Sequence, residues 1–96
     1  MTLDELQQWV RDDWKKRSKL QPSLEAQLLF AIEEFGEVAE AIRKKTMAND
    51  YKVDDDKLGS EFGDLLVTIV TLANNFDVNL TKEIKGFQAK LASRRA

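Results

Sequence analysis

The strongest constraint on the fold is a stretch of eight residues that contains four glutamates, EEFGEVAE at 33–40. Acids three or four residues apart share one side of a helix, where each like-charged pair costs roughly 0.2–0.5 kcal/mol. Glu40 has an evident counter-ion, Lys44, on the same predicted helix, whereas Glu33, Glu34 and Glu37 do not. A solvated acidic face is the ordinary interpretation of such a pattern. A bound divalent cation is the alternative.

The residues around this stretch predict a helix from about Pro22 or Ser23 to Lys45, since proline is well tolerated in a first helical turn. At about 100° per residue the acids fall in one arc, and the apolar residues fall in a separate arc on the opposite side. We expect this apolar arc to form core. It consists of Leu28, Ala31, Ile32, Phe35, Val38, Ala39 and Ile42.

A second acidic pair, Glu61 and Asp64, has the spacing of one helical turn in a predicted helix from about Lys57 to Phe76. The apolar face of this helix is wide, and Val67 and Val70 lie outside its centre. So wide a face predicts burial on more than one side, against a second subunit in so short a chain. The face consists of Leu58, Phe62, Leu65, Leu66, Ile69, Leu72, Ala73 and Phe76.

Two further helices are predicted at the ends of the chain. The first covers residues 2–20, where Thr2 and Glu5 form a capping box. The last begins at a cap, Asn79 or Thr81, and runs to about residue 94. An aspartate among residues 54–56 is predicted to cap the third helix. The expected fold is all-α: a single domain over residues 1–96, with two long central helices and two flanking helices.

Composition limits the available chemistry. The chain has no His and no Cys, which excludes imidazole and thiolate ligands. Carboxylate pairs on two facing helices would supply only hard oxygen ligands, which suit Mg²⁺, with Mn²⁺ as a substitute. Protein-bound Mg²⁺ commonly completes its shell with substrate phosphates. The acidic segments therefore favour a phosphate-bearing substrate.

Charge and hydropathy exclude other classes of function. The formal net charge is −2, whereas nucleic-acid binders normally show a basic excess. No apolar run approaches the roughly 18–20 residues of a membrane span. The first residues lack the basic and apolar regions of a signal peptide. We expect a cytoplasmic protein that binds neither nucleic acid nor membrane.

The ordered motifs EExxE at 33–37 and ExxD at 61–64 resemble the signature of the MazG-like nucleotide pyrophosphohydrolases, an all-α NTP pyrophosphatase group. The similarity extends over residues 28–41, including the glycine at 36. It continues through residues 61–66 and 72–74, a turn at 78–80 and a basic end at 90–95. It therefore covers nearly the whole chain.

The resemblance implies hydrolysis of a nucleoside triphosphate to a monophosphate and pyrophosphate. It implies that Mg²⁺ is held by Glu34, Glu37, Glu61 and Asp64. Glu33 and Glu40 would support these ligands. One glutamate would orient the attacking water, and Glu33 and Glu37 are the candidate catalytic residues.

Four residues are candidates for substrate binding: Thr68, Asn75, Lys90 and Arg94. Some relatives carry an aromatic residue at the position of Thr68, where it helps to hold the nucleoside; threonine cannot stack in that way. Asn75 could instead mark the end of its helix, and the two cations could be solvated helix ends. Trp9 and Trp14 could stack on a base, although packing is the alternative for both.

Two other interpretations of the whole chain stay open. One is a non-catalytic nucleotide- or metal-binding regulator on the same scaffold. The other is a structural helical oligomerisation module whose acids serve solubility. The expected partners are the nucleoside triphosphate and further copies of the chain, in a dimer or a dimer of dimers.

Overall fold

The computed structural model describes residues 1–17, 20–47 and 55–95, with the side chains of residues 55 and 56 excepted. Within these ranges the chain forms four helices and no strand, which confirms the all-α prediction. None of the described helices is long and apolar enough to cross a membrane. In chain order the helices are α1 (Leu3–Lys16), α2 (Leu24–Met47), α3 (Asp55–Asn74) and α4 (Leu80–Arg95).

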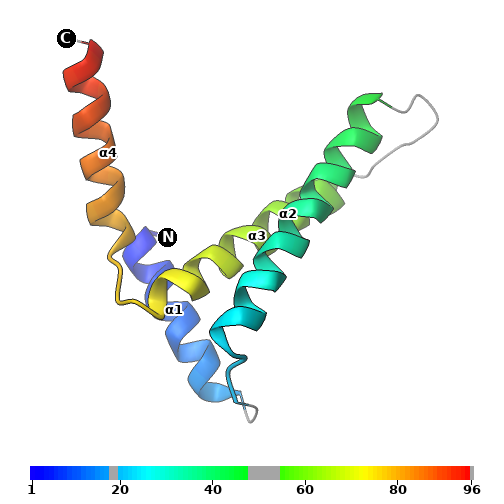
Figure 1. Cartoon of the computed structure of the whole chain (residues 1–96), viewed down its shortest axis with the longest axis horizontal. Coiled ribbons are helices and arrows are strands. Elements are labelled where there is room, and N and C mark those ends of the chain that lie inside the picture. Colours follow the sequence, from blue (N-terminus) through cyan, green and yellow to red (C-terminus); the bar gives the residue numbers. More distant parts are fainter. Residues whose placement is uncertain (18–19, 48–54, 96) are drawn as a thin grey trace.

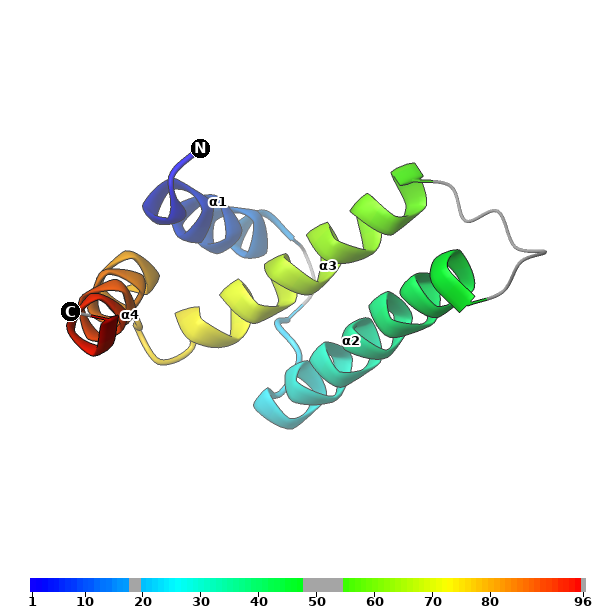
Figure 2. The same cartoon turned by 90° about the horizontal axis from the view of Figure 1, so that it is seen from above.

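The helices α2 and α3 lie side by side in opposite directions and form the main hairpin of the structure (Figure 1). The helix α1 packs across α3, and α4 packs mainly against α1. As a result α4 leaves the body of the molecule on the other side from the hairpin, as Figure 2 shows from above. The chain consists of a central α3 with helices on two sides and a projecting α4.

Local capping explains where the helices begin. The backbone N–H of Glu5 donates to Thr2 Oγ1, and the Glu5 carboxylate accepts from the Thr2 N–H, so the predicted capping box is confirmed. Ser23 and Asn79 accept from the first turns of α2 and α4 in the same way. The cap predicted at residues 54–56 lies outside the described side chains. The helix α1 ends at Lys16, earlier than predicted.

A buried amide pair fixes α1 to the end of α3. The Gln7 side chain donates to Asn74 Oδ1 at 2.9 Å and to the carbonyl of Val78 at 2.8 Å, and it accepts from the N–H of Leu80 at 3.0 Å. Asn74 in turn donates to the Gln7 carbonyl at 3.2 Å. Since these bonds cross the turn between α3 and α4, they set the direction in which α4 leaves.

The apolar core of the single chain is small. Its buried hydrophobic residues, among those described, are Val10, Val38, Ala41 and Val70. Val70, which periodicity places outside the centre of the apolar face of α3, is 0% exposed; it lies one turn before Asn74, on the side of α3 that bonds to α1.

The predicted core arc of α2 is only partly buried. Val38 is buried and Ala31 is half-buried, but Leu28, Ile32, Phe35, Ala39 and Ile42 are exposed. The side of α2 that packs on α3 instead carries Gln27, the half-buried Glu34, Val38 and Ala41. The expectation that acids and core lie on opposite sides of α2 is therefore wrong: Glu34 lies on the packed side, and most of the apolar arc faces solvent.

Candidate metal and nucleotide site

Three carboxylates meet between the two helices of the hairpin. Glu34 projects from the middle of α2, and Glu61 and Asp64 project from α3 one turn apart. Each offers a carboxylate oxygen, and these oxygens all lie within 4.8 Å of one another. We call these three residues the acidic cluster. The structure thus brings together three of the four predicted metal ligands.

Two oxygens of this cluster are buried without a partner. Oε2 of Glu34 and Oε2 of Glu61 are removed from solvent and accept no hydrogen bond from the described part of the protein. Both residues are half-buried, whereas Asp64 is exposed. A buried carboxylate oxygen without a donor is costly, because water no longer solvates its charge. A cation between the two helices would remove that cost.

The burial and the mutual repulsion of these acids raise two pKa values in the cluster. Loss of solvation raises the pKa of Glu34 above its ordinary value, and the charges of Glu37, Asp64 and Glu33 raise it further. The pKa of Glu61 is also raised, first by a hydrogen bond with Glu37, then by loss of solvation and by the neighbouring acids. Both carboxyls therefore favour protonation unless a cation replaces the proton.

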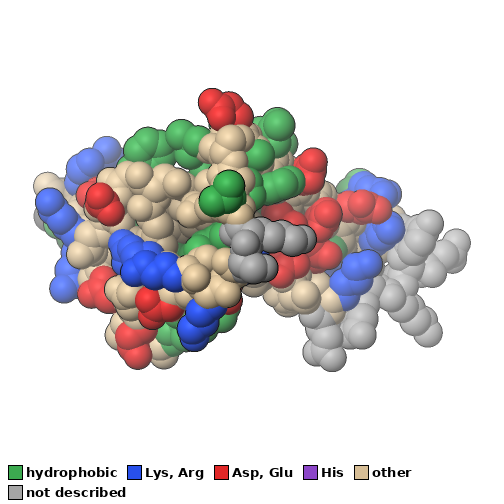
Figure 3. All heavy atoms as spheres, turned by 90° about the horizontal axis from the view of Figure 1, so that it is seen from below, with side chains coloured by type: hydrophobic (Ala, Val, Ile, Leu, Met, Phe, Trp, Pro, Cys, Tyr) green, Lys and Arg blue, Asp and Glu red, His purple; other side chains and the backbone are tan. Residues whose placement is uncertain are grey.

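The other predicted glutamates lie around the cluster. Glu37 is exposed and raises the pKa of both Glu34 and Glu61, which places it at the rim of the cluster, outside the group of three. Glu33 is exposed and acts on Glu34 through its charge. Glu40 forms an ion pair with Lys44 at 2.9 Å, and this contact lowers its pKa. In Figure 3 a group of acidic side chains lies to the right of the middle of one face, and Lys and Arg side chains lie to both sides of it.

The donor set suits a hard divalent cation. Every candidate ligand is a carboxylate oxygen, as Mg²⁺ and Mn²⁺ prefer. The two oxygens without hydrogen-bond donors are the direct structural sign that a positive group fits between α2 and α3. Glu34, Glu61 and Asp64 would hold it, with Glu37 available at the rim.

A cavity of about 450 Å³ adjoins the acidic cluster, because Glu34 lines both. Its walls are mainly apolar and come from α1, α2, α3 and the link that precedes α2. Both Trp9 and Trp14, for which the sequence left base stacking and packing open, line this cavity, which neither periodicity nor motif spacing would reveal. Its lining residues include Trp9, Val10, Trp14, Phe30, Val67 and Thr68.

The predicted substrate-binding residues lie at different distances from the acidic cluster. Thr68 lines this cavity, and its hydroxyl donates to the Asp64 carbonyl at 2.8 Å. Asn75 donates to Gln27 Oε1 at 2.6 Å and to the Thr71 carbonyl, so it holds α2 and α3 together at their far ends. Lys90 and Arg94 are exposed on α4, which projects away from the hairpin. Only Thr68 therefore lies beside the cluster in a single chain.

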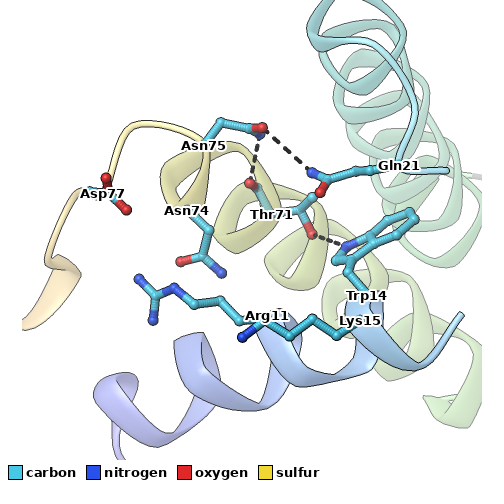
Figure 4. Close-up of a pocket in the computed structure, with 8 residues that line it drawn as sticks. All are labelled: Arg11, Trp14, Lys15, Gln21, Thr71, Asn74, Asn75 and Asp77. Carbon is cyan, nitrogen blue, oxygen red and sulfur yellow. Dashed lines mark hydrogen bonds between the residues drawn. The ribbon is translucent and has the colours of Figure 1, made fainter.

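A second cavity of about 340 Å³ lies between α1 and the end of α3 (Figure 4). Arg11 and Lys15 extend along one side of it, and Asn74 and Asn75 face them. It shares Trp14 with the larger cavity, but both asparagines are engaged in the structural hydrogen bonds described above.

Comparison with known proteins agrees with the geometry of the cluster. The model of the MazG nucleotide pyrophosphohydrolase domain matches residues 22–96, which include all the predicted metal ligands. The chain belongs to the MazG family.

A curated relative of this MazG protein is the Uncharacterized protein YvdC of Bacillus subtilis (strain 168). It is 28% identical over 102 residues, covering 98% of the MazG chain and 96% of that protein. No solved structure is similar enough to be matched. Family membership establishes a nucleotide pyrophosphohydrolase domain, and MazG domains generally use divalent metals.

Proposed function

We propose that this protein hydrolyses nucleoside triphosphates, NTPs or dNTPs, to nucleoside monophosphate and pyrophosphate in the presence of Mg²⁺, and so clears unwanted nucleotides from the pool. The observation that carries the proposal is the meeting of Glu34, Glu61 and Asp64, two of which keep a buried oxygen without a donor. Because the sequence has no His and no Cys, these carboxylates and their neighbours must supply the site.

Each residue of the site has a proposed role in the hydrolysis. A divalent cation held by the cluster and Glu37 would neutralise phosphate charge and acidify water. The water oxygen forms a new bond to phosphorus, and the bond between the α and β phosphates breaks to release pyrophosphate. Glu33 or Glu37, both exposed at the rim, would accept the proton that the water loses. Glu40 supports the rim while paired with Lys44.

The larger cavity is the proposed place of the nucleoside. Its volume of about 450 Å³ falls within the range of small-molecule pockets, roughly 300–1,000 Å³. Aromatic side chains on its walls, such as Trp9 and Phe30, offer faces on which a base can stack. Glu34 joins this cavity to the cluster, so a nucleoside bound there would have its phosphates beside the carboxylates. Thr68 lies at the same junction.

The proposal includes a homo-oligomer, a dimer or a dimer of dimers. The helix α4 packs mainly against α1, which keeps Lys90 and Arg94 away from the acidic cluster of their own chain. These cations would reach the phosphates of a bound substrate only from a neighbouring copy.

A substrate panel tests the proposed activity. The purified protein is incubated with the common NTPs and dNTPs and Mg²⁺, while pyrophosphate, monophosphate and orthophosphate are quantified separately. The proposal predicts equal amounts of pyrophosphate and monophosphate from at least one substrate, and a loss of this turnover in Glu61→Gln. The matched control, Glu83→Gln on α4, should retain it. Orthophosphate as the product, or no turnover on any nucleotide, would contradict the proposal.

A further inference from the structure

The cavity of about 340 Å³ between α1 and the end of α3 has one basic wall (Figure 4). Arg11 and Lys15 lie four residues apart on α1, so their side chains project from the same side of that helix. Like charges at this spacing destabilise a helix slightly, because they repel each other. An anion between the two side chains would turn this repulsion into attraction.

Neither cation has a partner within the part of the chain that the structure describes. No ion pair or hydrogen bond joins the side chain of Arg11 or Lys15 to another described residue, whereas Arg17 on the same helix pairs with Asp13 at 2.7 Å. Arg11 is half-buried, and its guanidinium extends into the cavity (Figure 4). The five N–H donors of this group are therefore available to a ligand.

The facing wall of the cavity is held in place by hydrogen bonds. Asn74 accepts from the Gln7 side chain at 2.9 Å and donates to the Gln7 carbonyl at 3.2 Å. Asn75 donates to Gln27 Oε1 at 2.6 Å. An amide nitrogen carries two protons, and the described residues accept one of those of Asn74, so the other is available to a ligand. A wall that is ordered before a ligand arrives reduces the entropy lost on binding.

The cavity keeps a net positive charge although one acid, Asp77, is among its described lining residues. Asp77 has a positive φ of 53° because it closes the turn after α3, in which the Val78 N–H donates to the Ala73 carbonyl at 3.2 Å. Its carboxylate lies at the end toward which the Arg11 guanidinium extends (Figure 4), yet the two form no ion pair. The backbone turn therefore accounts for the position of Asp77.

We propose that this cavity binds a small phosphate-bearing anion, with Arg11 and Lys15 as its main ligands. A phosphate group carries a charge of about −1.5 to −2 at pH 7, which two cations match better than they match a single carboxylate. A guanidinium can bind two phosphate oxygens at once, and an ammonium binds as a point charge. The volume of about 340 Å³ lies near the lower end of small-molecule pockets, roughly 300–1,000 Å³, so the ligand is small.

This anion site is distinct from the acidic cluster. None of Glu34, Glu61 and Asp64 lines it, although Trp14 and Thr71 line both it and the nucleoside cavity. Its cations contact the phosphate directly, so binding requires no divalent metal. The inference concerns binding alone and does not depend on the proposed activity.

The test is an NMR titration of metal-free, ¹⁵N-labelled protein in the presence of a chelator. Inorganic phosphate, ribose 5-phosphate and acetate are added separately at matched ionic strength. The indole N–H of Trp14 and the side-chain amide of Asn74 are the reporters, since both residues line the cavity. We expect at least one phosphate compound to bind saturably with a Kd on the order of 1 mM or tighter, and acetate to bind at least about tenfold more weakly. The tighter of the two phosphate compounds shows whether the site takes the free anion or a phosphate ester.

Three variants change the charge at chosen positions. Arg11→Gln should raise the Kd at least about tenfold, because it removes the bidentate cation. Asp77→Asn should lower the Kd roughly two- to fivefold, because it removes a repulsive charge while asparagine tolerates the positive φ. Lys16→Gln is the matched control, since Lys16 adjoins Lys15 but does not line the cavity, and it should leave the Kd within about twofold.

Four results would overturn the proposal. The first is a set of shifts that grow linearly with each phosphate compound and never saturate. The second is equal affinity for acetate and for phosphate. The third is an equal loss of affinity in Arg11→Gln and Lys16→Gln. Should the spectrum of Arg11→Gln show that this variant is unfolded, Asp77→Asn decides, and the fourth contradicting result is binding by Asp77→Asn that is no tighter than binding by the wild type.

Discussion

Glu34 on α2 and Glu61 on α3 each direct one carboxylate oxygen, Oε2, into a region from which water is excluded and in which the described residues provide no donor. Each of the two residues and Asp64 also offers one carboxylate oxygen, and these three oxygens lie within 4.8 Å of one another. Two negative groups so placed oppose the packing of the helices that carry them. The two carboxylates therefore repel each other and lack solvation within the hairpin, and a cation between the helices would remove this cost.

The first prediction concerns this conflict without metal. Glu34→Gln removes one charge, and the new amide can donate to the carboxylates beside it. In the presence of a chelator we expect its melting temperature to exceed that of the wild type by on the order of 2–6 °C. Differential scanning calorimetry measures this, with Glu83→Gln as an exposed control that should change little. A lower melting temperature for Glu34→Gln would mean that the carboxylate stabilises the metal-free fold.

The second prediction concerns pH. The folded-state pKa values of Glu34 and Glu61 are raised, so their cost to folding is present above those values and is relieved as the pH falls toward the unfolded value of 4.5. The lowered pKa of Glu40 acts only below 4.5. As the pH falls from neutrality toward 4.5, acidification should therefore relieve this cost in metal-free protein.

With Mn²⁺ present the trend should reverse, because protons compete with metal for the same carboxylates. Thermal melts across this pH range, with and without MnCl₂, measure both trends. The variant in which both Glu34 and Glu61 are replaced by glutamine should lose the pH trend without MnCl₂ and the reversed trend with it. Identical pH profiles for this variant and the wild type would show that these two carboxyls do not titrate in that range.

The third prediction concerns the amide pair that holds α1 to the end of α3. Gln7→Ala removes the partner of Asn74, Val78 and Leu80 and leaves buried polar groups unsatisfied. We expect a loss of roughly 2–4 kcal/mol in the free energy of unfolding, measured by urea denaturation. The neighbouring Gln8 is exposed and bonds only within its own helix, to Asp12, so Gln8→Ala should cost less than about 0.5 kcal/mol. Equal losses would remove the structural role assigned to Gln7.

The fourth prediction concerns the nucleoside cavity. Phe30 lines it, whereas the adjacent Leu29, which is also exposed, does not. If the base stacks there, Phe30→Ala should raise KM about tenfold with a smaller effect on kcat, since loss of a stacking side chain costs roughly 1–3 kcal/mol. Leu29→Ala should leave both constants within about twofold of the wild type. Steady-state kinetics on the best substrate of the panel distinguishes the two variants.

The sequence predicted the parts of the fold that depend on local chemistry. The capping box of Thr2 and Glu5 and the cap at Asn79 follow from residue type and spacing. The convergence of Glu34 with Glu61 and Asp64 was predicted because i, i+3 acids project from one side of a helix. The caps are set within one helical turn, whereas the convergence of the acids also requires that α2 and α3 face each other.

What the sequence could not predict is which apolar surface is buried within a single chain. Helical periodicity identifies an apolar arc such as that of Phe35, but it does not distinguish packing inside the chain from packing on another molecule. Glu34 was misplaced for this reason, because it lies on the side of α2 that α3 approaches. The hydrogen bond that Asn75 donates to Gln27 likewise depends on how α2 meets the end of α3.

The most direct test of the account is calorimetric titration of Mn²⁺ into metal-free protein at pH 7.5, for the wild type and for Glu61→Gln, with Glu83→Gln as the control. The account predicts saturable binding to the wild type and to Glu83→Gln, and a loss of affinity of on the order of 100-fold in Glu61→Gln, because a carboxylate ligand is removed. Binding of equal affinity to Glu61→Gln and the wild type, or no binding to the wild type at millimolar Mn²⁺, would contradict it.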